Sequence, residues 1–313
     1  MLMISVCNLH PKTGAVKKIA GEHKSFSADG LIFNMIYVPG NLTFPMGIDD
    51  KETGTVDHAY WIAETELNYE LWYKVRYWAE KHGYNFAYKG KEGSSGKPGA
   101  FPTEAKNSPV TGITWRDAVI WSNALTEWYN AVNRTKYICV YYEDSNFKKI
   151  IKNVDRNKKI YLNNGTQDNP YQKNDADGFR LLTSKEWELA ARYIDGKKWT
   201  QGNYMSGSTT SHTKNLLDIN ESDIEIVAWF SKVSTQDTKM LKANSLGLYD
   251  MSGNVWELCF DLLSEKNYPG RVMRGGSCFY WVEGLFVGFV NKNAPYSPSY
   301  DVGLRVAMTA FGD

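Results

Sequence analysis

Cysteine is the residue type in this chain with the widest chemical scope, because its thiolate is both a nucleophile and a soft metal ligand. The four cysteines are far apart in the sequence, with no C-x-x-C pair and no histidine at ligand spacing. They are Cys7, Cys139, Cys259 and Cys278. This spacing argues against a structural zinc site. It is typical of cysteines that act as small buried hydrophobic residues.

The other residue types that often carry catalysis form no constellation. The five histidines are isolated from one another, as is typical of surface or capping residues. They are His10, His23, His58, His82 and His212. No Gly-x-Ser-x-Gly sequence is present, which argues against the nucleophile elbow of serine hydrolases. Residue types and spacing alone therefore identify no catalytic centre.

Three segments have the apolar spacing of helices. Over about residues 68–81, apolar side chains recur at i, i+3 and i+4. Thr114 and Asp117 form an acidic variant of the capping box, which predicts a second helix with a buried aromatic stripe. Thr183 and Glu186 form a capping box that predicts a third, short helix.

Turn residues divide the rest of the chain into short strands and long loops. Residues 1–33 are expected to be a polar N-terminal leader, and a single domain is expected over 34–313. β-forming residues alternate with turn residues over 34–47, which predicts a hairpin. The glycines, prolines and serines of 89–108 predict a long surface loop. This pattern does not suit a doubly wound sheet and favours an irregular α+β fold.

Composition excludes several classes of protein. A chain of 313 residues with 42% hydrophobic and 23% charged residues can build a full core and is not a disordered protein. The 36 basic and 35 acidic residues leave no strong field to attract nucleic acid. No apolar run is long enough to span a bilayer. The 11 Trp, 20 Tyr and 13 Phe are unusually many, and they suit either a core or a recognition surface.

Six segments, read in order, resemble the formylglycine-generating enzyme and sulfatase-modifying factor family. The two longest are Gly-Phe-Arg-Leu-Leu-Thr-Ser-Lys-Glu-Trp-Glu-Leu-Ala-Ala-Arg (178–192) and Asn-Ser-Leu-Gly-Leu-Tyr-Asp-Met-Ser-Gly-Asn-Val-Trp-Glu (244–257). The others are Val38 to Gly47, Pro109 to Ala118, Arg274 to Ser277 and Val302 to Val306. The resemblance covers about residues 34–307 and implies an elaborated C-type-lectin-like α+β fold.

The second of these segments has two interpretations. Its glycines permit turns with positive φ, and Asp250 and Asn254 can bond local backbone amides while Trp256 enters the core. In relatives, the Asn and Glu of this segment help to bind a structural calcium ion. The resemblance therefore implies that Asn254, the Val255 carbonyl and Glu257, which offer suitable hard oxygen donors, could bind calcium here. Apart from this calcium, no cofactor is expected.

The catalytic pair of the family is incomplete in this chain. The family's oxidase holds copper with two nearby cysteines after Gly-Gly-Ser, because thiolates select Cu(I). Here only Cys278 lies in that segment, and Cys259 is on a segment where the family often carries a core residue. The departure predicts a protein that is not an enzyme. A formylglycine-type oxidoreductase with an atypical site and a purely structural family member are the alternatives.

Large apolar and hydroxyl residues replace the polar residues that family members carry after Ser277. Tyr and Ser on loops are typical of binding surfaces, whereas an extra core strand over Leu285 to Val290 is the alternative. We predict a ligand-binding region over about 258–306. Its predicted ligand-binding residues are Phe279, Tyr280, Trp281, Glu283, Leu285, Phe286, Val287, Phe289, Tyr296, Ser297, Ser299, Tyr300 and Asp301.

The same segment also resembles the variable proteins that retroelements diversify. In that group, adenine-directed mutagenesis rewrites Asn-type codons into many residue types. Most of the predicted residues are outcomes of that kind, but Trp281 and Glu283 cannot be reached from an Asn codon by changing adenines alone. The resemblance implies a non-catalytic binding protein at the cell surface.

The expected partner is a protein or another cell-surface ligand, and the expected state is a monomer. Residues Met1 to Cys7 are too short for a signal peptide and lack its basic region. A truncated lipobox ending at Cys7 would have a similar sequence, so a lipid anchor through this cysteine is a further expectation.

Overall fold

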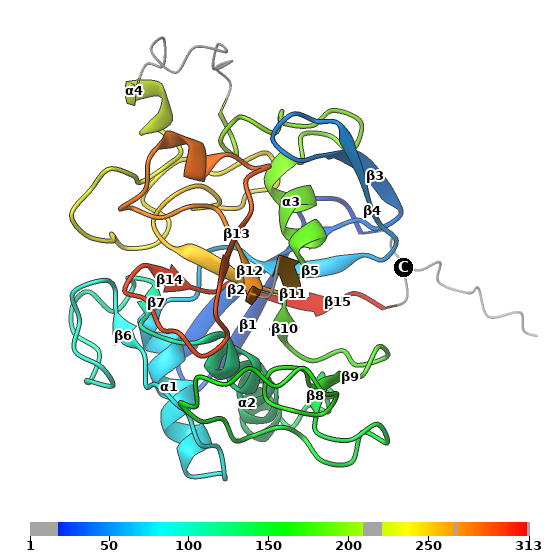
Figure 1. Ribbon diagram of the computed structural model, residues 1–313, viewed down its shortest axis with the longest axis vertical. Coiled ribbons are helices and arrows are strands. Elements are labelled where there is room, and N and C mark those ends of the chain that lie inside the picture. Colours follow the sequence, from blue (N-terminus) through cyan, green and yellow to red (C-terminus); the bar gives the residue numbers. More distant parts are fainter. Residues whose placement is uncertain (1–17, 209–220, 266–267, 312–313) are drawn as a thin grey trace, which may run out of the picture.

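A computed structural model of the chain describes residues 18–208, 221–265 and 268–311 (Figure 1). Cys7, the residue of the expected lipid anchor, lies outside the described residues. The model bears out the α+β class, with few helices, short strands and long connections. None of the helices in these three ranges is long and apolar enough to cross a membrane.

The three predicted helices are confirmed, together with the two predicted capping boxes. Helix α1 (Tyr69–Glu80) is capped by the side chain of Asn68. Helices α2 (Trp115–Asn133) and α3 (Ser184–Arg192) both begin with complete capping boxes. A fourth helix, α4 (Glu221–Ile224), is a single turn. Capping is a local interaction, and the sequence therefore predicts it well.

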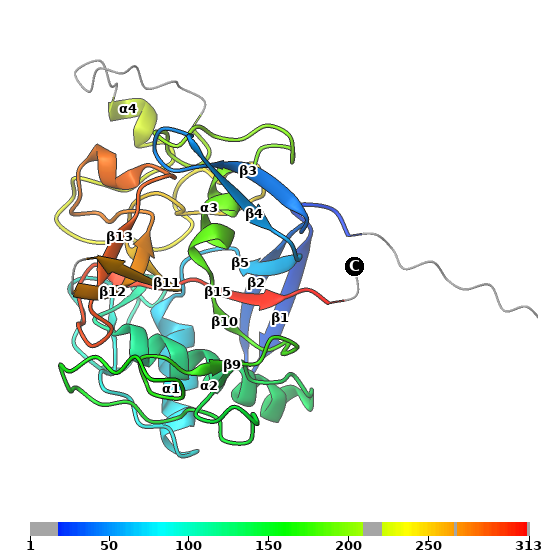
Figure 2. The same cartoon turned by 45° about the vertical axis from the view of Figure 1, so that its right-hand side comes forward.

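A five-stranded antiparallel sheet forms the centre of the molecule (Figures 1 and 2). Its order is β1 (His23–Ala28), β2 (Leu31–Val38), β5 (Tyr60–Ala63), β15 (Val306–Thr309) and β10 (Arg180–Leu181). Met35 and Tyr37 pack with α1 and α2, whereas Ile36 and Val38 pack with α3. Alternate residues of one strand thus enter two different cores, and both faces of the sheet are covered.

Two expectations for the N-terminal part are wrong. Strand β1 lies inside the expected leader over 1–33 and pairs with β2, so the sheet begins before residue 34. The expected hairpin over 34–47 does not form, because β3 (Leu42–Met46) pairs with β4 (Glu52–Val56) and β2 pairs with β1 and β5. Asn41 turns the chain between β2 and β3 with a φ of 55°. The two strands consequently separate into different sheets.

A second sheet carries the C-terminal part of the chain. Its order is β13 (Asn291–Asn293), β12 (Tyr268–Arg274), β11 (Trp256–Glu265) and β14 (Val302–Gly303). Strand β14 runs parallel to β11, and the other pairs are antiparallel. Two small ribbons complete the fold. They are β6 (Lys91–Glu92) with β7 (Val110–Thr111), and β8 (Tyr141–Tyr142) with β9 (Tyr171–Gln172).

Most of the tryptophans are in the core rather than on the surface. Six of them are almost fully buried: Trp72, Trp115, Trp121, Trp128, Trp187 and Trp256. Buried ion pairs connect the layers as well. The Arg305 guanidinium lies 2.7 Å from the Glu257 carboxylate, and Arg116 lies 2.6 Å from Asp168. Each of these charges is compensated, as burial in a low-dielectric interior requires.

Candidate functional site

The C-terminal segment folds back on the molecule immediately after β12. Gly275 and Gly276 have φ values of 91° and 77°, and a Cβ on Gly276 would lie only 2.7 Å from the Gly284 carbonyl oxygen. Only glycine tolerates this combination of conformation and close approach. The Arg274 guanidinium, at the end of β12, donates to the carbonyls of Val287 and Phe289 and pairs with Glu188. The segment is therefore held on its inner side by a buried charge.

The inner part of the predicted site is core, which corrects the expectation for Leu285, Phe286 and Val287. Leu285 and Phe286 are buried with Met205 and Ile224, and Val287 is buried in the cluster under α3. The alternative of a core strand predicts the burial of Leu285, Phe286 and Val287 correctly, but these residues do not form a strand. Residues Val282–Leu285 form a 3-10 turn, and a second turn follows at Val287 and Gly288, where Phe289 donates its amide to the Phe286 carbonyl; no strand forms before β13.

Two further predicted residues are attached to the core by one side of their rings. Tyr280 meets Trp256 edge to face with 4.9 Å between ring centroids, and Phe289 lies 6.1 Å from the same indole. Both are only half-buried. A ligand that contacts the Tyr280 or Phe289 ring would thus compete with the packing of that ring on Trp256.

The outer part of the predicted site lies at the surface. The side chains of Trp281 and Tyr300 are 77% and 54% exposed, and Glu283 is exposed as well. Phe279 meets Tyr300 edge to face with 5.0 Å between ring centroids. Asp301 accepts hydrogen bonds from Ser277 and Ser299. The structure thus brings Phe279, Ser299, Tyr300 and Asp301 together, 20 residues apart in sequence.

Tyr296 and Ser297 lie on the adjoining loop. The Arg116 guanidinium is 5.8 Å from the centroid of the Tyr296 ring, and Ser297 closes a turn by donating its N–H to the Ala294 carbonyl. Both residues are half-buried. Phe286, one of the predicted ligand-binding residues, is therefore buried and does not share a solvent-facing surface with Tyr300.

A pocket of about 460 Å³ opens beside the outer part. Its lining includes Ser299 and Tyr300 from the predicted site, together with Tyr88, Lys89, Lys91 and Arg156 from distant loops. A volume of this size is in the range of ligand-binding sites. Sequence reasoning missed the last four residues. The one available signal was the combination of basic and aromatic residues in two loops of unusual length.

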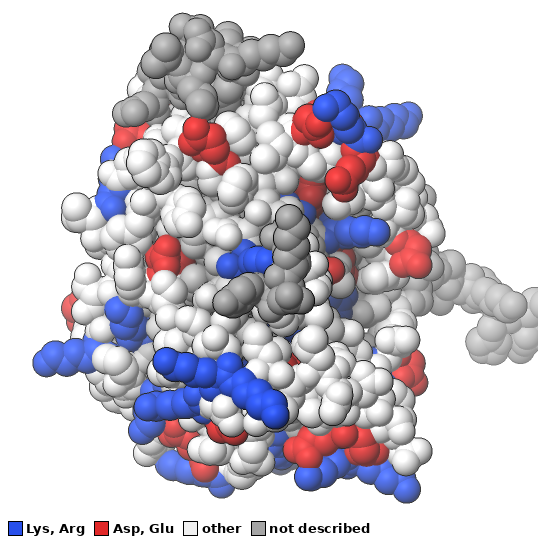
Figure 3. All heavy atoms as spheres, in the orientation of Figure 1, with Lys and Arg blue, Asp and Glu red and all other residues white. Residues whose placement is uncertain are grey.

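The pocket is basic. Burial without an acidic neighbour lowers the pKa of Lys91, whose ammonium donates to the Ser94 carbonyl. The Arg156 guanidinium lies 4.6 Å from the centroid of the Tyr88 ring. Figure 3 shows that Lys and Arg side chains gather on the lower part of one face, although the net charge of the chain is only +1. Positive charge is thus concentrated locally rather than over the whole surface.

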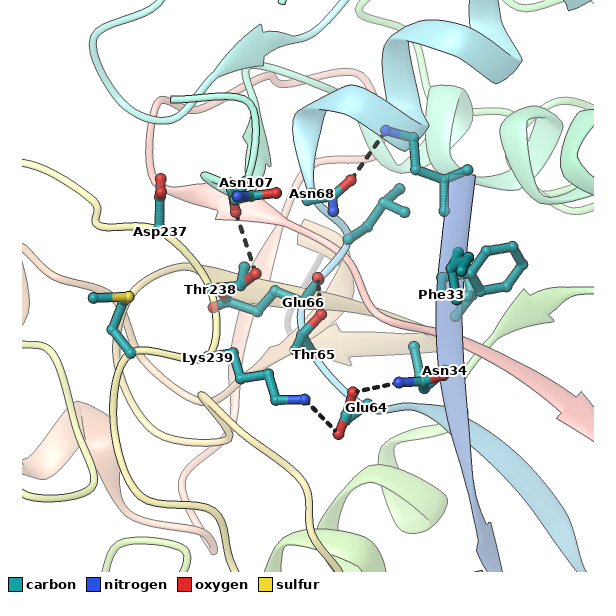
Figure 4. A pocket seen from close by; sticks show the side chains of 16 residues that line it. Phe33, Asn34, Glu64, Thr65, Glu66, Asn68, Asn107, Asp237, Thr238 and Lys239 are labelled. Carbon is teal, nitrogen blue, oxygen red and sulfur yellow. Dashed lines mark hydrogen bonds and ion pairs between the residues drawn. The ribbon is translucent and has the colours of Figure 1, made fainter. Parts of the chain in front are cut away.

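A second pocket, of about 310 Å³, contains none of the predicted ligand-binding residues (Figure 4). Its polar groups are paired with one another: Glu64 accepts from Asn34 and forms an ion pair with Lys239. Burial raises the pKa of Glu66 well above its usual value, and nearby Asp250 raises it further. The Glu66 carboxylate accepts from the Asn254 side chain and the Val255 amide. These contacts fix the base of the second sheet.

The expected calcium ligands are engaged by protein groups. Both carboxylate oxygens of Glu257 face Arg305, and one also accepts from the Trp187 indole at 2.8 Å. The side-chain oxygen of Asn254 accepts the Gln236 amide at 3.0 Å. A cation at this position would stand beside the Arg305 charge and compete with it for Glu257. As arranged, these residues do not fit a calcium ion, and within the described ranges no group of three His, Cys, Asp or Glu side chains could hold a metal.

The two C-terminal cysteines have no reactive environment. Cys278 and Cys259 are both buried and free. Burial, reinforced by Asp301, raises the pKa of Cys278 to about 12, and burial also raises the pKa of Cys259 well above its usual value. Each thiol is therefore protonated at neutral pH, whereas a nucleophile or soft metal ligand needs the thiolate.

Comparison with known proteins identifies the family. Residues 26–310 match the sequence profile of the sulfatase-modifying factor enzyme 1-like domain. The chain belongs to this family, as the six motifs predicted.

Named relatives include an enzyme and proteins described as inactive. The chaperone protein LppX of Paenibacillus barcinonensis is 27% identical over 222 residues, which cover 68% of this chain and 73% of that protein. The formylglycine-generating enzyme of Streptomyces coelicolor is 31% identical over 42% of this chain and 48% of its own length. The inactive C-alpha-formylglycine-generating enzyme 2 of Mus musculus is 30% identical over 42% of this chain and 44% of its own length. The chain thus spans about half the length of the last two.

Solved structures share the fold. The crystal structure of CarF has a TM-score of 0.68 with 24% identity, covering 89% of this chain and 98% of that one. Treponema denticola variable protein 1 has a TM-score of 0.66 with 25% identity, covering 92% of this chain and 99% of its own. The second is a variable protein, of the kind that the C-terminal segment resembles and to which the Treponema variable protein A also belongs.

Proposed function

We propose that this chain is a non-catalytic ligand-binding protein that presents its recognition site on the C-terminal loops of a lectin-like scaffold. One observation carries the proposal. The aromatic and hydroxyl side chains of the outer part, Ser299 and Tyr300, line the 460 Å³ pocket, while the inner part is locked into the core. A rigid base below an exposed aromatic surface reduces the entropy lost when a ligand binds.

The cysteines support the non-catalytic half of the proposal. A copper oxidase of this family would need two thiolates, and Cys278 is a single buried thiol whose pKa is raised to about 12. Relatives named as inactive in mouse and cattle are consistent with loss of activity in the family.

The proposal includes diversification and display. Exposed positions such as Tyr300 accept most substitutions at little energetic cost, which a retroelement-rewritten site requires. We further propose that the protein stands at the cell surface, with Cys7 as the residue that would carry a lipid. The likeness to a solved structure named Treponema denticola variable protein 1 supports diversification.

A formylglycine-type oxidoreductase is the alternative function, because part of the chain is 31% identical to the formylglycine-generating enzyme of Streptomyces coelicolor. Incubation with Cu(I) and a sulfatase-type cysteine peptide, followed by mass spectrometry, separates the two functions. We expect unmodified peptide. A formylglycine product that disappears in Cys278→Ser would overturn the binding proposal.

Sequencing the gene from many isolates tests diversification. We expect substitutions at outer positions such as Tyr296, Ser299 and Tyr300, conservation at Leu285 and Val287, and a template repeat with a reverse transcriptase in the neighbouring DNA. Substitutions spread evenly along the chain would contradict a diversified site.

A further inference from the structure

Three cations surround the pocket beside Tyr300. Lys89 lies just before β6, Lys91 is the first residue of β6, and Arg156 comes from the loop between β8 and β9. No carboxylate is among the residues that line this pocket. The pocket therefore differs from the one in Figure 4, where Glu64 and Lys239 neutralise each other.

The contacts of Lys91 and Arg156 are with neutral groups. The Lys91 ammonium donates to the Ser94 carbonyl, and Arg156 donates through Nε to the Ala87 carbonyl at 2.7 Å. In the described part of the chain, no ion pair to a carboxylate is formed by Lys89, Lys91 or Arg156. Elsewhere many surface lysines pair with acids, as Lys106 does with Glu70 at 3.0 Å. These three positive charges therefore neutralise no carboxylate in the described part of the fold.

Aromatic rings border the same charges. The Lys91 ammonium is 6.0 Å from the centroid of the Tyr300 ring. The Phe279 ring packs edge to face against the same tyrosine. More than half of the Tyr300 side chain remains exposed. An exposed ring offers a flat face on which the CH groups of a sugar ring can rest through dispersion. The adjacent cations can form charge-assisted hydrogen bonds with an acidic group on that sugar.

We propose that this pocket binds an acidic saccharide, with Tyr300 beneath a sugar ring and Lys89, Lys91 and Arg156 around its carboxylate or sulfate. This inference rests on the proposed binding function and specifies its ligand class. A concavity of about 460 Å³ is in the size range of small-molecule sites, whereas a folded protein partner covers a broad surface of about 800 Å² on each side. The basic residues belong to the scaffold loops, so they would select acidic ligands whatever the outer positions 296–301 carry.

The test uses the full chain and three tetrasaccharides in calorimetric titrations at low salt. One is hyaluronan-derived and carries carboxylates, one is heparin-derived and carries sulfates as well, and one is neutral maltotetraose. We expect binding of at least one acidic sugar, none of maltotetraose, and a loss of affinity as salt rises. A preference between the two acidic sugars identifies the anionic group.

Matched variants locate the binding. Lys91→Ala and Arg156→Ala should each weaken binding of the acidic sugar by about tenfold or more, the effect expected for one charge-assisted hydrogen bond. Tyr300→Leu should weaken it while leaving the charges intact. The controls are Lys97→Ala, in the same loop but outside the pocket, and Lys239→Ala, at the other pocket; neither should change affinity.

Two outcomes overturn the inference. Either neither acidic sugar binds up to millimolar concentration, or one binds equally well to the wild type, Lys91→Ala and Arg156→Ala. Capture of an acidic peptide in place of the sugars, lost in Tyr300→Leu, would overturn the ligand class and leave the binding function standing. Copper-dependent formylglycine formation would instead overturn the binding function itself, so the two failures are distinct.

Discussion

Two parts of the C-terminal segment have different environments: residues 284–288 are buried, whereas residues 296–301 are half-buried or exposed. Both contain aromatic residues, and both were predicted to contact a ligand. Phe286, in the inner part, is 8% exposed and packs against Met205 and Ile224. Tyr300, in the outer part, is 54% exposed and borders a basic pocket.

The difference arises from the residues, distant in sequence, that each part contacts. The backbone amides of Val287 and Gly288 donate to the carbonyls of Tyr204 and Gly202, so the loop that carries Met205 covers the inner part. The outer part meets Gly112 and the basic loops around Lys91 and Arg156. An aromatic residue thus becomes core or recognition surface through its neighbours, which are distant in sequence.

The largest expected effect is at the charge that anchors the inner part. Arg274→Ala should destabilise the protein by about 3 to 5 kcal/mol, because Glu188 loses a buried partner and two carbonyls lose their donor. The matched control, Arg156→Ala, should change the free energy of unfolding by less than about 1 kcal/mol, since its side chain is at the surface. Urea unfolding measures both. Equal losses would remove the distinction between the two parts.

A smaller effect is expected from two phenylalanines in the same segment. Phe286→Ala should cost about 3 kcal/mol by leaving a cavity beside Met205 and Ile224. Phe279→Ala should cost about 1 kcal/mol, because its half-buried ring mainly supports Tyr300. Urea melts compare the variants directly. A larger loss in Phe279→Ala would reverse the assignment of core and surface.

The smallest effect concerns pH at the outer part. Burial lowers the folded-state pKa of Lys91 below 10.5, so between that lowered value and 10.5 the unfolded chain binds more protons than the folded one. Stability attributable to Lys91 should therefore rise with pH in this window. The gain should be under about 0.5 kcal/mol, because the side chain is largely solvated. Lys91→Met should lack the rise in urea melts across the window.

NMR titration of the lysine side chains gives an independent measurement. Lys91 should titrate below 10.5, and an added acidic sugar should raise its pKa by supplying the missing counter-charge. A Lys91 that titrates above 10.5 without ligand would indicate an acidic partner and contradict the description of the pocket.

The sequence predicted what depends on local interactions. Thr114 with Asp117 and Thr183 with Glu186 mark the helix starts, because each capping box closes within four residues. The pairing of β2 with β5 could not be predicted in the same way, since it joins Ile36 to Ile62 through the packing of the entire sheet.

The candidate site was predicted in part for the same reason. Tyr300 stood out as an aromatic residue on a proline-rich loop, but Phe286 stood out equally, and only the tertiary neighbours distinguish them. Lys91 and Arg156 carry no motif, and the fold brings them to the site from more than 140 residues away. A single sequence contains no local signal for such a convergence.

The outer loop is held by its main chain. Gly112 and Arg116 donate their backbone amides to the carbonyls of Ser299 and Pro295, and Trp256 donates its amide to the carbonyl of Asp301. Every amino acid supplies a backbone carbonyl, so these attachments survive whatever side chains stand at 295–301. The path of the loop therefore does not depend on which side chains the loop carries. Positions that can change without altering the path of the loop multiply the number of distinct surfaces that one scaffold can present.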